Sequence, residues 1–543
     1  MPFPRFGNGV TQAHLYITRQ FNGLKRFAEE LRLGYPSLAQ LRPEFDRLKR
    51  GLYKNNLGES IPEPTTLAMI EMLPSPAAVD ELVGLYLTYI DPVHRILHVP
   101  SFLRELDEFW ARVENPGAIS TAFVVQLLLI LSCAWNLADP ETLQLKNEGR
   151  LKCYTAVKWI AVVEKWIQNF QIKRPEITAF RIQCLLIMAQ NSQGVKRSRA
   201  WLATGTLTKQ AMLAGYHRDP GTYSKISVFN KEMRRRVWNT IVELDLQIAL
   251  DRGLPPSVQA SDYDSAPVLN IDDSEISEST VELPPEKPVD QVTDSSFQAI
   301  LSRSLPLRLK TCAMMHSPRI ACTYEDILRM DWEFNKHLSQ IPSWSASFPS
   351  RDLRIEYRII LWKAILENKI AQSLLSLHTP FAIEAPAEPL FVPSARARLE
   401  IATNILATQK RLHDMSMQLS LCCLGDWTVQ AAVSVCQLLY TGDGRHRKCH
   451  LQRNYIHSLS LIVFRVHFSS PIAARVLRLT SFPGGNGLAV SRGQTSPCRQ
   501  RCQRVFLPVS HPRHGEDEIV ARTGCCGSAA SCRSAAGVGP VTV

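Results

Sequence analysis

Apolar residues recur at helical spacing from Val79 to Gln259, and proline or glycine interrupts the pattern at short intervals. The interruptions stand at Asp91-Pro92, Val99-Pro100, Asn115-Pro116-Gly117, Asp139-Pro140, Arg174-Pro175 and Asp219-Pro220-Gly221. A period near 3.6 residues punctuated by turn signals predicts a series of helices joined by short turns. Because no segment with a period of two competes with this pattern, we predict an all-α fold.

The clearest single helix lies between Met233 and Ile248. Its apolar residues Met233, Val237, Ile241, Leu244 and Ile248 follow at steps of three or four, so they form one stripe on one helix face. Pro255 and Pro256 block continuation, so we predict that this helix ends near Arg252-Gly253.

Helical patterns return from Phe297, and the segment between the two helical regions is acidic, proline-bearing and poor in aromatic residues. Such a composition buries little apolar surface, so we predict a solvated linker there. The expected division is a partly helical lead-in (1–78), a first helical domain (79–264), the acidic linker (265–296), a second helical half (297–482) and a disordered tail (483–543). Further helices are expected over 352–378, 394–414 and 426–440.

The formal net charge of +12 favours anionic partners but does not determine the fold. The run from Ile119 to Ala138 is the one serious candidate for a membrane span, because a span needs about 20 apolar residues. Gln126 and Asn136 argue against it. We expect a buried helix and no membrane partner.

A triple arginine, Arg234 to Arg236, lies within the predicted helix. Successive helical residues are rotated by about 100°, so the three side chains cannot all face one phosphate track. Glu232 stands one turn before Arg236, and Glu243 and Asp245 supply anions on later turns. Structural ion pairing is therefore favoured over DNA contact for Glu232, Arg234, Arg235, Arg236 and Asp245.

Other polar groups give weaker signals. His94, His98 and His217 are interpreted as histidines packed at helix ends rather than metal ligands. Asp272 and Asp273 resemble a magnesium motif but lie in the acidic linker, where a solvated loop is expected. No catalytic, cofactor or metal site is predicted. Two short basic clusters are candidates for nuclear import: Lys196, Arg197 and Arg199, and Arg445, Arg447 and Lys448.

Several stretches, in order, resemble the fungal-specific transcription factor domain, the middle homology region of zinc-cluster regulators. They are "LVGLYLTYIDPVHRILHVPSF" (82–102), "RAWLATGTLTKQAMLAGYHRDP" (199–220) and "EMRRRVWNTIVELDLQIALDRGLPPSV" (232–258). The first resembles the opening helix and turn of the family, the second its tryptophan-led helix, and the third its most characteristic segment. The resemblance implies a helical regulatory body in the nucleus.

The cysteines depart from the family pattern. A binuclear zinc cluster needs six closely spaced cysteines, because six thiolates hold its two zinc ions. This chain contains no Cys-x-x-Cys, and its late cysteines, from Cys498 to Cys532, are not spaced in that way. We therefore expect no cofactor in this chain, with zinc entering only if an upstream exon supplies the cluster.

The resemblance implies a transcription regulator, and such regulators often control secondary-metabolite gene clusters. The expected partners are other transcription factors or the transcription machinery, DNA reached indirectly, a homodimer or heterodimer, and a small-molecule effector. Two alternatives stay open. One is an interaction protein that competes for the partners of full-length regulators without binding DNA, and the other is a helical isoprenoid enzyme that uses Asp272 and Asp273.

Overall fold

The computed structural model describes residues 63–113, 115–138, 152–169, 176–195, 199–316, 322–344, 353–414 and 427–441. Within these ranges every regular element is an α-helix or a short 3-10 helix, which confirms the all-α prediction. The helices that precede residue 265 are α3 (Thr66–Glu71), α4 (Pro76–Tyr89), α5 (Asp91–His94), α6 (Val99–Arg112), α7 (Thr121–Ala134), α8 (Lys152–Asn169), α9 (Ile177–Ser192), α10 (Ala200–Leu213) and α11 (Val228–Arg252).

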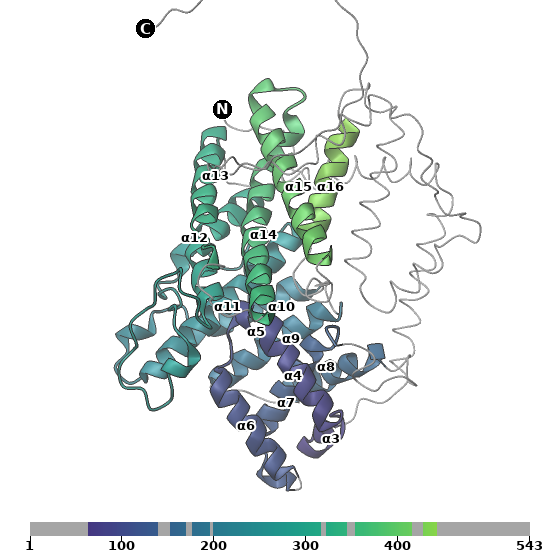
Figure 1. Ribbon diagram of the computed structural model, residues 1–543, viewed down its shortest axis with the longest axis vertical. Coiled ribbons are helices and arrows are strands. Elements are labelled where there is room, and N and C mark those ends of the chain that lie inside the picture. The colour runs from purple at the N-terminus through teal and green to yellow at the C-terminus, as the bar shows by residue number, and fades with distance from the viewer. Residues whose placement is uncertain are drawn as a thin grey trace, which may run out of the picture. The chain divides into compact units, whose positions relative to one another are not determined.

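The later helices are α12 (Ser296–His316), α13 (Tyr324–Ser339), α14 (Leu353–Glu384), α15 (Val392–Asp414) and α16 (Trp427–Thr441) (Figure 1). The 3-10 helices are η1 (Pro116–Ala118), η3 (Pro220–Thr222), η4 (Ala260–Asp262), η5 (Asp273–Glu275) and η7 (Pro389–Phe391). Helices α14, α15 and α16 pack side by side. The predicted tail (483–543) and most of the lead-in lie outside the described residues.

Helix α7 is apolar around its whole circumference, and this explains its position. All residues from Phe123 to Ala134 are buried, and the helix packs against α4, α8 and α9. A helix without a polar face must be covered on all sides. In the described part of the chain, no helix combines the length and the apolar character needed to cross a bilayer.

Helix α11 has clear signals at both ends. The Ser227 side chain accepts a hydrogen bond from the Asn230 amide at 3.3 Å, which caps the first turn. Gly253 ends the helix in the left-handed region, with φ 64°, as glycine does most easily. The predicted end near Arg252-Gly253 is confirmed.

Two large apolar cores meet at α12, which contributes residues to both. The first is built mainly from α4 and α6 to α11, and the second mainly from α12 to α16. Leu305, Leu309 and Cys312 of α12 belong to the first core, and Val93 of α5 belongs to the second. The two helical regions therefore pack against each other through α5 and α12. The domain boundaries given above stay predictions.

The acidic segment 265–296 is not the solvated linker that its composition predicted. Ile271 and Ile276 are buried against Phe229 and Met233 of α11. The Asn270 side-chain amide donates to the carbonyl oxygens of Lys287 and Pro288, so it fixes a turn inside the segment. The prediction was wrong because tertiary partners supply apolar contacts and counter-charges that composition does not reveal.

Candidate functional site

Arg236, in the middle of α11, is completely buried and joins two carboxylates. Its Nε lies 3.1 Å from Glu232 Oε1, one turn earlier, and its Nη1 lies 2.6 Å from Asp273 Oδ1. Burial raises the pKa of Glu232, because Arg236 offsets only part of the cost of removing this carboxylate from water. Arg236 therefore faces the interior and not a surface ligand.

Asp273, in η5, is shared by two arginines. Arg95 Nη2 forms a second ion pair with Asp273 Oδ1, and the Val99 amide donates to Oδ2 at 2.9 Å. Burial alone would raise the pKa of Asp273, but Arg236 and Arg95 hold it well below its usual range. One ionised side chain thus ties the segment 265–296 to α6 and α11.

Arg95 completes the group from the end of α5. Its backbone is left-handed, with φ 45°, and among the described residues it is the single non-glycine residue with positive φ. A left-handed conformation costs roughly 1–2 kcal/mol. Arg95 Nη1 lies 2.9 Å from Asp91 Oδ2, and burial raises the pKa of Asp91 to about 6 although Arg95 lowers it. We call Asp91, Arg95, Glu232, Arg236 and Asp273 the Asp273 cluster.

The other two arginines of the triplet point elsewhere. Arg235 makes two contacts with the Asp219 carboxylate, Nη2 to Oδ1 at 2.9 Å and Nε to Oδ2 at 3.2 Å. Burial would raise the pKa of Asp219, but the hydrogen bond from Arg235 contributes to lowering it. The Arg234 guanidinium lies 4.7 Å from the centre of the Tyr216 ring. The three arginines of the triplet therefore have different partners and point in different directions.

Glu243 forms a second buried ionic group, two turns after Arg236. Arg308 of α12 places Nη2 2.6 Å from Glu243 Oε2, and Lys369 of α14 places Nζ 2.9 Å from Oε1. Burial opposes ionisation, but the two cations lower the pKa of Glu243 to about 2. This ion triad joins α11, α12 and α14 across the boundary between the two cores.

Asp245 pairs with a loop rather than with a cation. Its Oδ2 accepts from the Ser257 amide at 2.6 Å, and its Oδ1 accepts from the Ser257 hydroxyl at 2.8 Å. Burial raises the pKa of Asp245, and these hydrogen bonds oppose the rise. Asp245 thereby holds the chain just after the end of α11 against α10.

The sequence did not point to Arg95, Arg308 or Lys369. One signal was present, because Glu243 and Asp245 stand among the buried residues of an apolar stripe, and a buried carboxylate requires partners. Those partners lie on other helices, 65 residues away for Arg308 and 126 for Lys369. Sequence spacing therefore gave no means of choosing them.

The three histidines lie apart from any arrangement of metal ligands. His98 Nδ1 accepts from the Ser101 amide at 3.3 Å, and its Nε2 donates to the Asp273 carbonyl oxygen at 2.9 Å. Burial, together with the nearby positive charge of Lys369, lowers the pKa of His94 to about 3. Within the described ranges, no three His, Cys, Asp or Glu side chains gather as a metal site would require.

The paired aspartates that resemble a magnesium motif have other partners. Asp272 Oδ2 lies 2.5 Å from Lys287 Nζ, and its Oδ1 accepts from the Asp294 amide at 2.9 Å. Asp273 is 2% exposed and bound to two arginines, so the expectation that it lies in a solvated loop is wrong. The two carboxylates are used to fix the segment.

Of the basic clusters, only Arg199 is described, and it is exposed just before α10. The remaining residues, Lys196, Arg197, Arg445, Arg447 and Lys448, lie outside the described residues. Their role in nuclear import stays a prediction.

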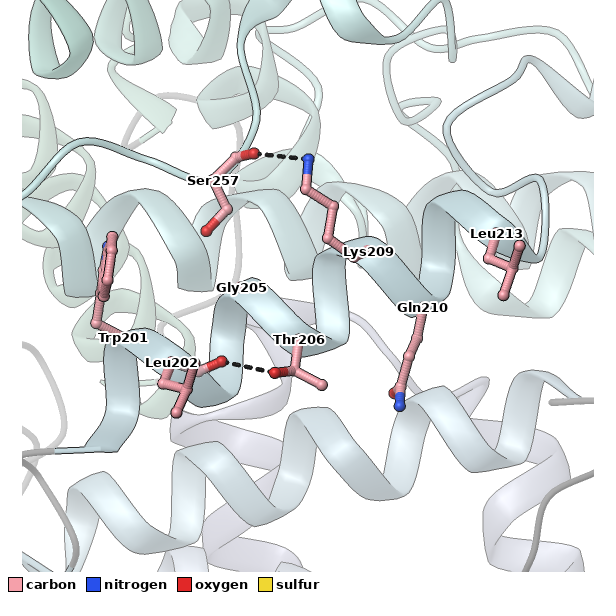
Figure 2. Close-up of a pocket in the computed structure, with 8 residues that line it drawn as sticks. All are labelled: Trp201, Leu202, Gly205, Thr206, Lys209, Gln210, Leu213 and Ser257. Atoms are coloured by element: carbon pink, nitrogen blue, oxygen red, sulfur yellow. Dashed lines mark hydrogen bonds between the residues drawn. The ribbon is translucent and has the colours of Figure 1, made fainter.

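The outward face of α10 borders a shallow surface groove of about 620 Å³ (Figure 2). Its lining is Trp201, Leu202, Gly205, Thr206, Lys209, Gln210, Leu213 and Ser257. Leu213 is 91% exposed and Leu202 is 67% exposed, near opposite ends of the helix. Two exposed leucines therefore border this groove.

The fungal specific transcription factor domain matches residues 83–353, from within α4 to the start of α14. The chain belongs to this family. The matched residues include the Asp273 cluster and Glu243 with its partner Arg308. The family is one of transcription factor domains, not of enzymes.

Relatives carry corresponding names. The chain is 28% identical over 337 residues to transcription factor opdR of Penicillium oxalicum. The aligned region covers 61% of this chain and 41% of that protein. It is 28% identical over 340 residues to transcription factor lepE of Aspergillus flavus, an alignment that covers 62% of this chain and 39% of that protein. It is 27% identical over 400 residues to the pyrrolocin cluster transcription factor fsdR of a fungal species (strain NRRL 50135), with 69% and 49% covered. The chain spans less than half the length of these relatives.

Proposed function

We propose that this chain is the regulatory body of a fungal transcription regulator and that it acts in the nucleus by binding partners. The family match over residues 83–353 carries the proposal. The charges of α11 support it, because Arg235 and Arg236 are taken up by internal carboxylates. An arginine that is buried in an ion pair is not available to neutralise a phosphate.

The body is proposed to control a secondary-metabolite gene cluster. One relative is named as the transcription factor of the pyrrolocin cluster, which supports this role. The regulated pathway is identified by the genes whose transcripts fall when this gene is deleted, and a neighbouring biosynthetic cluster is expected among them.

The proposed partners are other transcription factors or the transcription machinery, a second copy or a related chain, and a small-molecule effector. DNA is proposed to be reached through such a partner. The buried ion triad of Glu243 joins helices of both cores, so the body can transmit a partner's binding from one core to the other.

A tethered reporter assay tests the regulatory role. The full chain is fused to an unrelated DNA-binding domain, and reporter transcription is compared with that of the DNA-binding domain alone. We expect transcription to change in either direction. Arg236→Met should abolish the effect by destabilising the body, whereas the matched variant Arg234→Met should keep it. A folded, nuclear fusion that leaves the reporter unchanged contradicts the proposal.

Two further measurements separate the alternatives. A gel shift with the purified chain and promoter DNA is expected to show no sequence-selective complex, and such a complex would contradict DNA contact through a partner. Magnesium-dependent turnover of a prenyl diphosphate that is lost in Asp272→Ala would establish the enzyme instead. A chain without DNA binding that represses only when full-length regulators are present would be a competitor for their partners.

A further inference from the structure

The loop that carries Asp273 has a fixed base and an exposed tip. At the base, the Lys287 amide donates to the Asn270 carbonyl oxygen at 3.0 Å, which closes a loop over residues 270–287. Directly after it, the Trp344 indole donates to the Val289 carbonyl oxygen at 2.9 Å. Residues 277–286 form the tip, and none of their side chains is buried. The tip can therefore change its shape while the base stays in place.

Few hydrogen bonds hold the backbone of this tip. Between Val281 and Glu286, no amide or carbonyl group forms a backbone–backbone hydrogen bond with the described part of the chain. In the preceding turn, the Thr280 amide donates to the Ser277 carbonyl oxygen at 3.0 Å, and the Ser277 amide donates to Thr280 Oγ1 at 2.8 Å. Exposed bonds of this kind contribute little, because water replaces them when they open. An enzyme can therefore draw these residues into an extended conformation at low cost.

Two serine hydroxyls stand in the turn at the start of the tip. Ser277 Oγ lies 2.9 Å from Ser279 Oγ, and both side chains are exposed. Acidic residues surround them at Glu275, Glu278, Glu282 and Glu286. A serine that is followed by an acidic residue three positions later, as Ser279 is by Glu282, suits the cationic substrate cleft of an acid-directed Ser/Thr protein kinase.

The structure separates Ser279 from Ser261, which has the same spacing to an acidic residue. Ser261 lies in the 3-10 helix η4, and the carboxylate of Asp264, three positions later, accepts from Arg218 Nε at 3.0 Å. By contrast, Glu282 makes no hydrogen bond or ion pair with the residues that the structure describes. The acidic residue that a kinase would bind is therefore free at Ser279 and occupied at Ser261.

Thr323 also has this spacing, but its hydroxyl is used to cap α13. The hydroxyl donates to Asp326 Oδ2 at 2.8 Å and accepts from the Asp326 amide at 3.2 Å. Phosphorylation there would break the cap. The sequence pattern alone does not distinguish these three positions, whereas the contacts favour Ser279.

We propose that Ser279 is phosphorylated by an acid-directed Ser/Thr protein kinase, with ATP as the phosphoryl donor. Ser279 Oγ attacks the γ-phosphorus of ATP, and the bond from this phosphorus to the β,γ-bridging oxygen breaks. ADP leaves, and the hydroxyl proton passes to a carboxylate of the kinase. The modification does not depend on the proposed function of the regulatory body.

Phosphorylation changes the charge of the tip and leaves the body folded. A phosphoserine carries a charge of about −1.5 to −2 at neutral pH. Arg104 of α6 lies 3.9 Å from Glu278, but both side chains are exposed, so this ion pair is weak and its loss costs little. We therefore expect the modified tip to present a new anionic site to a cationic partner surface, with a change in Tm of less than about 2 °C.

The test is phosphorylation of the purified full chain by casein kinase 2 with ATP, followed by mass spectrometry of the fragments. Phosphate should enter at Ser279 at least about tenfold faster than at Ser261 or Thr323, because only the first has a free acidic residue three positions later. Ser279→Ala should remove this phosphate, and the matched variant Ser261→Ala should keep it.

A second pair of variants tests how the kinase recognises the tip. Glu282→Gln keeps the hydroxyl but removes the acidic residue, and it should lower kcat/KM of the kinase for Ser279 by about tenfold. The matched variant Glu286→Gln removes an equal charge seven positions after Ser279 and should change kcat/KM by less than about twofold. Circular dichroism and the Tm of each variant show that it is folded.

The chain isolated from a filamentous fungus should carry the same phosphate on Ser279. The proposal is overturned if this phosphate is absent there, if the kinase modifies Ser277, Ser261 or Thr323 in preference, or if Glu282→Gln is modified as fast as the wild type. These measurements use neither DNA nor a reporter, so their failure leaves the regulatory role standing. Conversely, an inactive reporter fusion does not count against the modification.

Discussion

Helices α10 and α11 pack against each other, yet they distribute their residues in opposite ways. In α11 the charged residues Glu232, Arg236 and Asp245 are completely buried. In α10 the leucines at 202 and 213 are exposed. The charges of α11 are stable inside because each has a partner within 3.1 Å, while in the described part of the chain nothing covers the leucines of α10.

The comparison teaches that partners, rather than polarity alone, decide burial. A buried ion pair is costly to form and still more costly to break on one side only. An exposed leucine costs the monomer little, and it matters when a second surface covers it. Substitutions of these buried charges should therefore lower the stability of the protein, and substitutions of the exposed leucines of α10 should leave it nearly unchanged.

The largest effect is expected for Arg236→Met. The methionine fills similar space but removes the close counter-charge of the buried Glu232 and leaves the buried Asp273 with Arg95 alone. The free energy of unfolding should fall by about 3–5 kcal/mol. The matched variant Arg234→Met loses only the contact with the Tyr216 ring and should cost at most about 1 kcal/mol. Urea unfolding measures both, and equal losses would contradict the division of the triplet.

A pH-dependent effect is expected for Asp91→Asn. In the unfolded chain Asp91 loses its proton near 3.8, whereas in the folded protein its pKa is about 6. The folded state binds more protons in this window, so the Asp91 contribution to stability falls as the pH rises from about 4 to about 6.

The variant lacks this contribution. The difference in unfolding free energy should move in favour of Asp91→Asn by on the order of 2 kcal/mol between about pH 4 and pH 7. The contribution of Asp273 to stability has the opposite pH dependence. Because its pKa is lowered, that contribution is present above this window and is lost as the pH falls through the acid range. If the unfolding free energies of the wild type and of Asp91→Asn changed in parallel with pH, Asp91 would ionise as an ordinary surface carboxyl.

A smaller effect is expected for Gly205→Ala. Alanine raises helix propensity by about 1 kcal/mol, but its Cβ would push the Ser257 hydroxyl away from Asp245. The substitution should therefore stabilise the protein in a Ser257→Ala background and not in the wild type. A double-mutant cycle should give a coupling energy of about 1 kcal/mol, and additive effects would place Ser257 too far away to matter.

The smallest effect on stability is expected for Leu213→Gln. This side chain is almost fully exposed, so the free energy of unfolding of the monomer should change by less than about 0.5 kcal/mol. Leu207→Gln, six positions earlier on the buried face, should cost several times more, because it places an amide in the first core. Thermal unfolding at a concentration where the chain is monomeric makes the comparison, and a large loss in Leu213→Gln would mean that the chain itself covers this leucine.

The helices were predictable where local signals were strong. The apolar steps and the glycine after Arg252 predicted the course and the end of α11, and the uniform apolar run predicted the buried helix α7. The contact between Glu232 and Arg236 joins residues four positions apart, so helical periodicity alone suggested it. The segment 265–296 was mistaken for a linker because its composition is that of a solvated chain.

The sequence by itself determined an all-α body, the helix that carries the arginine triplet and the family to which the chain belongs. Only the tertiary structure decided that Asp273 enters the interior, that Arg95 and Arg236 meet it there, and that Arg308 and Lys369 share Glu243. The physical reason is that helix periodicity depends on neighbours within about one turn, whereas the stability of a buried charge depends on counter-charges brought from distant parts of the chain.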